Sequence, residues 1–433
     1  MKLTKGKIFS LGIQHVLAMY AGAIAVPLVV GAGIGLNSEQ LTYLVSIDIF
    51  MCGIATLLQV WKGKFFGIGL PVVLGCTFTA AGPMIAIGNA YGLPAIFGAI
   101  IGSGIIVLLI SRSFSKLVAF FPPVVMGSVV TIIGLTLIPV AMTNLAGGSG
   151  SPDFGSFKNL ALGIITLVII LAIFRFFKGF LRSIAILLGI LAGTGLATFF
   201  GEVDFTPVQE ANWFQLPKLF YFGVPEFHLM PILIMTIVAV VSLVESSGTY
   251  FALSDICERK LTDEDLCKGY RSEGLAYLIG GLFNAFPYTT FSQNVGLIQL
   301  SSVRSLRVIY AAAGILIFLG FVPKIAAFTT IIPSSVLGGA MITMFGMVVA
   351  SGIKMLGKVD FSLQENLLIV ACSIGVGLGI TVAPDLFNGL PDGIKIITDS
   401  GIVMGSLTAF LLNLVFNVLK SRGEKAIPAE VKQ

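Results

Sequence analysis

The chain has 433 residues, of which 56% are hydrophobic and only 11% charged, and its mean hydropathy is +1.00. Soluble proteins average about 45–50% apolar and roughly 25% charged residues, so the composition excludes a water-soluble protein and predicts an all-α polytopic protein of the cell (plasma) membrane. The net charge of +5 is spread over many short loops. This spread argues against a nucleic-acid-binding surface, which would concentrate its basic residues on one face.

Long apolar stretches, each near the roughly 20 residues that a spanning helix needs, recur along the chain as far as about Leu419. Lys2, Lys5 and Lys7 precede the first stretch, and because that stretch continues past Val30 it is interpreted as an uncleaved span rather than a signal peptide. Most other basic residues cluster in every second loop, and the loops between them hold most of the acidic residues. Since cytoplasmic loops carry the basic excess, this pattern predicts fourteen transmembrane segments with both termini in the cytoplasm.

The first two predicted spans each contain a polar residue at membrane depth. His15 lies in the first span, next to Gln14, and Asp48 lies in the second. A histidine within the membrane can be a structural hydrogen-bond partner or a direct substrate contact, and the sequence leaves both interpretations open. Asp48 is predicted to be architectural, because no broken helix adjoins it in the sequence.

Two later segments are too rich in proline, glycine and polar residues to form ordinary spanning helices. The segment 69–80 contains Pro71, two glycines and two threonines, and the segment 286–296 contains Pro287 followed by several hydroxyl and amide side chains. They fall in spans 3 and 10, which are equivalent positions of two seven-span repeats, 8–200 and 229–420. Because each repeat has an odd number of crossings, the second is predicted to be inverted. Paired broken segments in inverted repeats indicate the midplane binding site of a transporter.

Both broken segments are predicted to contain a short β-strand. Proline removes a backbone donor and favours extended geometry in the residue before it. The two strands could pair near the membrane midplane and still present backbone N–H and C=O groups to a ligand. The short helix that begins near Asn294 would add a partial positive charge at its N-terminus.

Two acidic residues in the second half are candidates for function. Glu245 lies deep in an apolar span with no basic residue near it in sequence. A carboxylate at the bilayer centre costs about 2.5–3.5 kcal/mol, so an acid there indicates a functional site, and burial favours the protonated form that could exchange a proton with substrate. The alternative is a neutral acid that only supports packing. Glu273 follows Arg271 near the start of the next span and is predicted to form an ion pair at the cytoplasmic edge.

Three short motifs resemble those of one transporter family. The sequence Gln-Asn-Val-Gly at 293–296, followed by Ser301, is similar to the signature of the nucleobase–ascorbate transporter family, also called nucleobase:cation symporter-2. Gln-His at 14–15 and Glu-Ser-Ser-Gly at 245–248 are similar to the family's two other marks. The similarity extends along essentially the whole chain, and within the family the chain most resembles the bacterial xanthine permeases.

The resemblance implies a division of the fold and a set of site residues. Spans 1–4 and 8–11 would form a core domain, and spans 5–7 and 12–14 a gate domain through which a homodimer forms. Glu245 and Gln293 match the side chains that hydrogen-bond the nucleobase, and Glu245 and Glu273 match positions for proton coupling. The other matched positions contribute backbone groups or support the site, and they are Phe78, Ser292, Asn294 and His15.

The chemistry of these residues agrees with a purine substrate. The edge of xanthine alternates N–H donors with carbonyl acceptors, and the Gln293 amide can donate and accept at once. Phe78 and Phe291 would supply area for stacking against the ring. Three places depart from the family pattern. Ser301 replaces the usual threonine, and Thr249 stands where several relatives have an acid or a histidine, so a second titrating group is missing there. The sequence Ser-Leu-Arg at 305–307 differs from the basic pattern that is common after the motif in purine transporters, which leaves the choice between xanthine and urate open.

The predicted function is proton-coupled uptake of xanthine by alternating access, with a uric acid or uracil permease of the same family as the alternative. An inorganic-anion exchanger of similar architecture would require a basic residue in a broken segment, and neither segment contains one. A membrane enzyme would require a metal-ligand or nucleophile motif, and none is present. Neither enzymatic activity nor a metal or cofactor is therefore expected.

Overall fold

The computed structural model describes residues 3–117, 122–391, 395 and 397–419, and the chain divides into two compact units. The first unit contains the residues up to Ser115 together with Ile138–Met344, and the second contains 116–137 with the residues from Phe345 onward. All the candidate site residues belong to the first unit. Lys2 and the basic residues within 420–433, on which the predicted cytoplasmic termini partly rest, lie outside the described residues.

Helices make up most of both units. The elements that lie mainly in the first unit are α1 (Lys5–Gly33), α2 (Ser38–Val60), β1 (Leu74–Cys76), η1 (Phe78–Ala80), α3 (Ala81–Tyr91), α4 (Leu93–Leu117), α6 (Phe157–Phe176), α7 (Phe180–Ser183), α8 (Ala185–Phe199), α9 (Thr206–Glu210), α10 (Leu229–Cys257), α11 (Asp263–Leu282), β2 (Tyr288–Thr290), α12 (Ser292–Ser301), α13 (Leu306–Gly320) and α14 (Pro323–Thr330). Two helices run from one unit into the other, α5 (Pro123–Leu145) and α15 (Ser334–Leu356). The second unit adds α16 (Gln364–Val382), α18 (Gly401–Asn413) and η3 (Leu414–Leu419).

Nine helices among the described residues are long and apolar enough to cross a membrane, namely α1, α2, α4, α5, α6, α10, α15, α16, and α18 together with η3. The helices α13 and α14 pass the same test as a pair, but they are bent by 80° at the break between them. The fold is therefore that of a helical polytopic membrane protein, with nine or ten candidate spans by length and composition.

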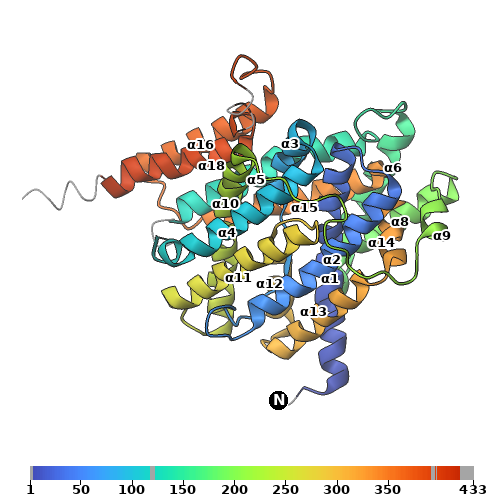
Figure 1. The fold of residues 1–433 in the computed structure, drawn as a ribbon, viewed down its shortest axis with the longest axis horizontal. Helices are drawn as coiled ribbons and strands as arrows, with labels where there is room; N and C mark the ends of the chain where they lie inside the picture. Colours follow the sequence, from blue (N-terminus) through green and yellow to red (C-terminus); the bar gives the residue numbers. More distant parts are fainter. Residues whose placement is uncertain (1–2, 118–121, 392–394, 396, 420–433) are drawn as a thin grey trace, which may run out of the picture. The chain divides into compact units, whose positions relative to one another are not determined.

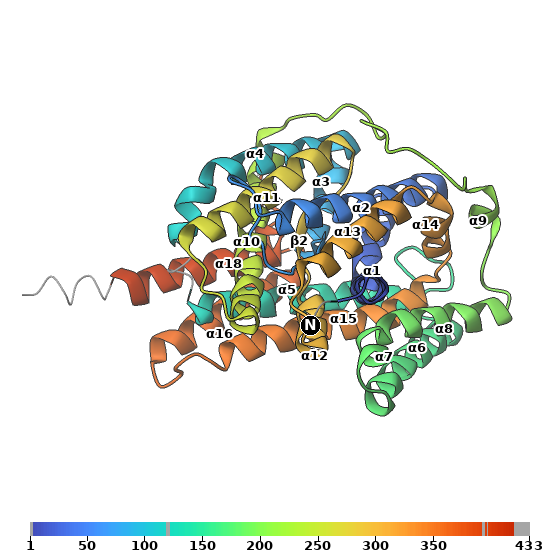
Figure 2. The same cartoon turned by 90° about the horizontal axis from the view of Figure 1, so that it is seen from below.

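Glycine brings pairs of helices in the first unit into backbone contact. A Cβ added to Gly104 of α4 would lie 2.8 Å from the carbonyl oxygen of Gly274 in α11, and one added to Gly53 of α2 would lie 2.7 Å from the carbonyl oxygen of Ala313 in α13. Figures 1 and 2 both show α2 and α13 side by side. Because lipid is as apolar as the helix surfaces, such close packing stabilises helix association where a hydrophobic driving force is absent.

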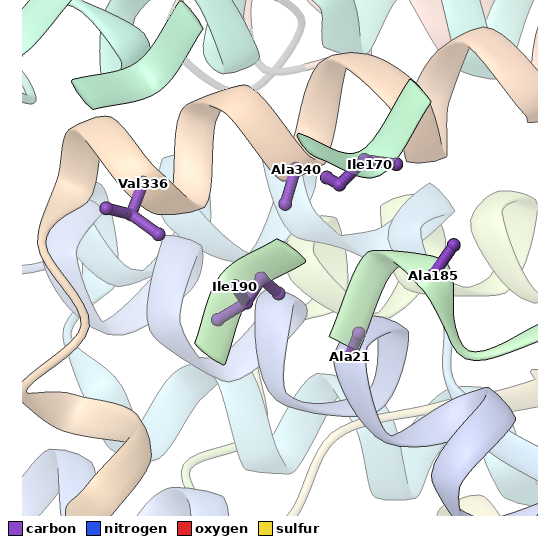
Figure 3. Packing of buried hydrophobic residues seen from close by; sticks show 6 residues of the cluster. All are labelled: Ala21, Ile170, Ala185, Ile190, Val336 and Ala340. Atoms are coloured by element: carbon purple, nitrogen blue, oxygen red, sulfur yellow. The ribbon is translucent and has the colours of Figure 1, made fainter. Parts of the chain in front are cut away.

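A second region of close packing in the first unit joins α1, α6, α8 and α15. Figure 3 shows six small or branched apolar side chains that gather between these helices, Ala21, Ile170, Ala185, Ile190, Val336 and Ala340. All six are buried. Interdigitated side chains of this kind gain many weak dispersion contacts, so this cluster holds α6 and α8 against α1.

The two broken segments form a two-stranded antiparallel sheet. Leu74 pairs with Thr290 and Cys76 with Tyr288. Beyond the strands, the ladder continues through hydrogen bonds from Thr77 N to the Pro287 carbonyl oxygen at 2.9 Å and from Phe291 N to the Val73 carbonyl oxygen at 3.0 Å. Each strand then leads into a short helix, β1 through η1 into α3 and β2 into α12. In Figure 2, β2 is visible in the interior of the fold, beside α10.

Asp48 of α2 anchors the strand β2. Its Oδ1 accepts a hydrogen bond from Phe286 N at 2.7 Å and another from the Tyr288 hydroxyl at 3.4 Å, and its side chain is fully buried. The predicted architectural role agrees with these contacts. The reason given for that prediction was wrong, however, because Asp48 lies directly against the second broken segment, which is far from it in sequence.

Candidate functional site

Two serines of α10 tie this helix to both strands. The Ser242 hydroxyl lies 3.4 Å from the Thr77 hydroxyl, which follows β1. One turn later, the Ser246 hydroxyl lies 3.1 Å from the Thr289 hydroxyl of β2 and accepts a hydrogen bond from Thr290 N at 3.4 Å. Residues four apart share one face of a helix, so this face of α10 lies against the strand pair.

Glu245 lies on α10 immediately before Ser246 and is partly exposed. Its neighbour across the site is Thr79 of η1, whose side chain is buried. None of the ion pairs among the described residues includes Glu245. Within the described residues, the carboxyl is therefore not neutralised by a basic side chain.

The first turn of α12 contributes the predicted amide. Ser292 is exposed and Gln293 is partly buried, and no side chain caps the helix at Phe291. The first backbone N–H groups of a helix have no partner within it and carry a partial positive charge. Phe78 begins η1 directly after the β1 ladder. Because α10 contacts both η1 and α12, the elements that carry Phe78, Glu245 and Gln293 meet around the paired strands.

His15 and Asn294 support this turn from behind. The Asn294 Nδ2 group donates to His15 Nδ1 and to the His15 carbonyl oxygen, each at 3.0 Å. Both side chains are buried. These contacts agree with the first of the two interpretations that the sequence left open for His15, a structural hydrogen-bond partner, and substrate contact by His15 stays a prediction.

Phe291 is enclosed by protein. Its ring lies between α1 and β1, where a Cβ added to Gly22 would come within 2.6 Å of the ring and a Cβ added to Gly75 would clash with it. The side chain is only 5% exposed. The two glycines therefore lie against the ring, nearest its Cε1 and Cε2 atoms, and of the two aromatic residues predicted to stack on substrate, only Phe78 keeps partial exposure.

Glu273 does not form the ion pair predicted at the cytoplasmic edge. The helix α11 begins at Asp263, a full ten residues before Glu273, so the carboxyl lies well inside the helix and is fully buried. Its Oε1 accepts a hydrogen bond from the Tyr250 hydroxyl of α10, which in turn accepts one from the Gln59 amide of α2. The prediction was wrong because the charged segment that begins at Asp263 is already part of α11. Glu273 therefore lies in the buried middle of the helix and not at its end.

Several polar residues around the site were not singled out from the sequence. They are Gln59, Thr79, Ser242, Ser246 and Tyr250. The serines carried a usable signal, because two hydroxyls four residues apart in an apolar span mark one polar face of a helix. Among the described residues, no group of three or more His, Cys, Asp or Glu side chains could hold a metal ion.

Residues 6–386 match the model of a family described as "Permease family". The chain is 65% identical to "Xanthine permease" of Bacillus subtilis (strain 168) over 413 residues, which cover 95% of this chain and 94% of that relative. It is 62% identical to "Uric acid permease PucK" of the same organism, with 95% of each chain covered. Among solved structures, the transmembrane domain of the cyanobacterial bicarbonate transporter BicA is similar at a TM-score of 0.65 and 16% identity, covering 91% of this chain and 97% of that one.

Proposed function

Since the chain belongs to this permease family of nucleobase transporters and is not an enzyme, we propose that it imports xanthine together with protons across the cell membrane by alternating access. The observation that carries the proposal is the meeting of a carboxyl without a basic partner, Glu245, and an uncapped helix N-terminus bearing Gln293 at one pair of strands. Discontinuous segments of this kind hold the substrate in many secondary transporters.

Each element of the proposed site has a role that follows from its chemistry. Glu245 accepts hydrogen bonds from the ring N–H groups, and Gln293 donates to one atom of the purine edge while accepting from another. Phe78 and Ser292 contribute backbone groups, and Phe78 also offers its ring face. Asn294 and His15 hold the first turn of α12 in place, and Phe291 fills the space behind it. Thr249, one turn after Glu245, has no titratable group, so the transported proton is assigned to the carboxyls of Glu245 and Glu273.

Proton coupling is assigned to Glu245 and Glu273. Glu245 lies on α10 and Glu273 on α11, and the hydrogen bond from the Tyr250 hydroxyl to Glu273 Oε1 joins these two helices. A carboxyl held among apolar helices favours its neutral form unless a partner stabilises the charge. Uptake of one proton by this pair would therefore accompany uptake of the substrate, and its release on the inside would reset the carrier.

We further infer fourteen spans in two inverted repeats, 8–200 and 229–420, with both termini in the cytoplasm. The nine apolar helices and the bent pair α13–α14 account for ten spans. The shorter apolar helix α8, the charged-ended helix α11 and the two strand–helix segments supply four more. Spans 1–4 and 8–11 would form the core domain, and spans 5–7 and 12–14 the gate domain and the surface of a homodimer.

Uptake of labelled xanthine by cells that lack their own purine permeases tests the proposal. We expect saturable uptake that increases at acidic external pH, and we expect Gln293→Glu to abolish it because a second carboxyl replaces the amide donor. Gln299→Glu, on an exposed position of the same helix, is the control and should leave uptake unchanged. Wild-type uptake by Gln293→Glu would remove Gln293 from the site.

Uric acid is the second candidate substrate, favoured by the 62% identity to a uric acid permease. Competition of labelled xanthine uptake by unlabelled uric acid, uracil and xanthine separates the candidates. Stronger competition by uric acid than by xanthine would assign the chain to uric acid transport.

A further inference from the structure

Glu273 is the end of a buried chain of three polar side chains drawn from three helices. The Gln59 amide donates to the Tyr250 oxygen, and the Tyr250 hydroxyl donates to Glu273 Oε1. Gln59, Tyr250 and Glu273 all have 0% of their surface exposed. The remaining polar atoms of the chain, Gln59 Oε1 and Glu273 Oε2, are buried without a hydrogen-bond partner within the described residues. A buried polar network that is only partly satisfied is sensitive to a change in any member.

Ser246 connects this chain to the strand that leads into the candidate site. Ser246 lies four residues before Tyr250 on α10, so the two buried side chains share one face of this helix. The Ser246 hydroxyl is 3.1 Å from the Thr289 hydroxyl and accepts from Thr290 N at 3.4 Å. Thr289 and Thr290 belong to β2, two residues before the first turn of α12.

The protonation state of Glu273 decides how these hydroxyls are oriented. An ionised carboxyl only accepts, so it takes the Tyr250 proton in a hydrogen bond; a protonated carboxyl has one O–H to donate. When Glu273 binds a proton, its O–H can donate to the Tyr250 oxygen, and the Tyr250 O–H then turns to the Ser246 oxygen. The Ser246 O–H is in turn directed at the Thr289 hydroxyl. The only covalent bond that changes is the O–H on Glu273, and the other hydroxyls rotate.

We propose that Tyr250 and Ser246 are positioning residues that transmit the protonation of Glu273 to strand β2, and through β2 to the turn of α12 that holds Gln293. This inference rests on the proposed function, because it takes Glu273 as a proton site. The titratable groups that face Glu273 are Tyr250 and Glu245 from α10 and Tyr270 and Tyr277 from α11, while α2 contributes the neutral amide of Gln59.

The same two helices contain a matched control pair. The Tyr270 hydroxyl of α11 lies 2.6 Å from the Ser247 hydroxyl of α10, and both side chains are fully buried. Tyr270→Phe and Ser247→Ala each remove one buried, hydrogen-bonded hydroxyl, as do Tyr250→Phe and Ser246→Ala. Only the second pair of substitutions interrupts the path from Glu273 to β2.

The experiment uses the full chain in proteoliposomes with two readouts. Xanthine counterflow at equal pH on both sides needs no net proton movement, whereas xanthine accumulation under an imposed pH gradient does. Coupling between two sites is typically worth about 5- to 150-fold. We expect Tyr250→Phe and Ser246→Ala to keep counterflow but to lose pH-driven accumulation by a factor in this range, with a flattened pH profile. Tyr270→Phe and Ser247→Ala should retain both activities and the wild-type profile.

Three outcomes separate the inference from the function on which it rests. If Tyr250→Phe and Ser246→Ala accumulate xanthine as well as the control variants do, while Glu273→Gln does not, the inference is refuted and the proton site stands. If Glu273→Gln itself accumulates xanthine with the wild-type pH profile, the proposed proton site is refuted, and the inference with it. If Tyr250→Phe does not fold, Ser246→Ala decides the same question, because it interrupts the path at the next hydroxyl.

Discussion

Replacing Asn294 with alanine tests whether its contact with His15 positions the first turn of α12. The Asn294 Nδ2 group donates two hydrogen bonds of 3.0 Å to His15, and the two side chains are 1% and 3% exposed. Removing the donor leaves the buried His15 Nδ1 unpaired, at a cost of about 1–3 kcal/mol, and removes the second hydrogen bond of the His15 carbonyl, which keeps its bond within α1, at a cost of about 0.5–1.5 kcal/mol. Asn294 Oδ1 is itself buried without a partner, so its removal offsets about one of these penalties. The expected net loss is about 1–3 kcal/mol.

This loss should appear in substrate affinity, because Gln293 precedes Asn294 in the same helical turn. A loss of about 1–3 kcal/mol corresponds to a Kd for xanthine that is about 5- to 150-fold higher. Equilibrium binding of labelled xanthine to purified protein measures it. Gln299→Ala, which alters an exposed side chain of the same helix, should bind xanthine as the wild type does.

A double-mutant cycle with His15→Ala shows whether the two residues act as a pair. Residues in direct contact have interaction energies of about 0.5–3 kcal/mol, whereas independent sites add within about 0.5 kcal/mol. We expect the double variant to be weaker than wild type by little more than either single variant. Additive losses would refute the reasoning, because they would mean that Asn294 positions the turn through some contact other than His15.

Three further substitutions test the framework around the site, each followed by thermal unfolding in detergent with a thiol-reactive dye that reports exposure of the buried cysteines. Asp48→Ala should destabilise the protein by about 1–3 kcal/mol, because the Phe286 N–H, which donates to Asp48 at 2.7 Å, is left unpaired. Asp48→Asn keeps an acceptor and should lose less stability. Equal losses of stability would contradict the anchoring role. Gly75→Ala should lower the stability of the protein by about 1–3 kcal/mol, because the added Cβ overpacks against the Phe291 ring. Adding Phe291→Leu to this variant should recover part of the lost stability. No recovery would mean that the clash lies elsewhere. Gly104→Ala should destabilise the protein, because the added Cβ would lie 2.8 Å from the backbone of α11. Gly314→Ala is the control: its Cβ would meet nothing within 4 Å, so it should be neutral or stabilise the protein by up to about 1 kcal/mol. Similar effects of the two substitutions would argue against backbone contact between α4 and α11.

Some features of this protein followed from local composition alone. The apolar content and the scarcity of charge identified a polytopic membrane protein, because a helix in lipid must be apolar over its whole length. The two proline-containing polar segments stood out for the same reason, and they are the segments that form β1 and β2. Glu245 was recognisable because a carboxyl without a basic neighbour is rare in such a span.

Sequence reasoning failed where the answer depended on a partner from another helix. Glu273 was assigned to an edge ion pair because Arg271 is two residues away in sequence, but its partner is Tyr250 of the neighbouring helix. Phe291 looked like a stacking surface, because nothing in its own segment shows that Gly22 and Gly75 enclose its ring.

Composition along the chain therefore determined which class of protein this is and which segments and side chains are unusual. The reason is that each spanning segment must by itself be apolar enough to lie in the bilayer. Only the tertiary structure decided which of those side chains meet. Asn294 binds His15 across 279 residues, and Asp48 holds the entrance to β2 across 238. Such pairs are selected by the packing of whole helices, and no local pattern of residues records the choice.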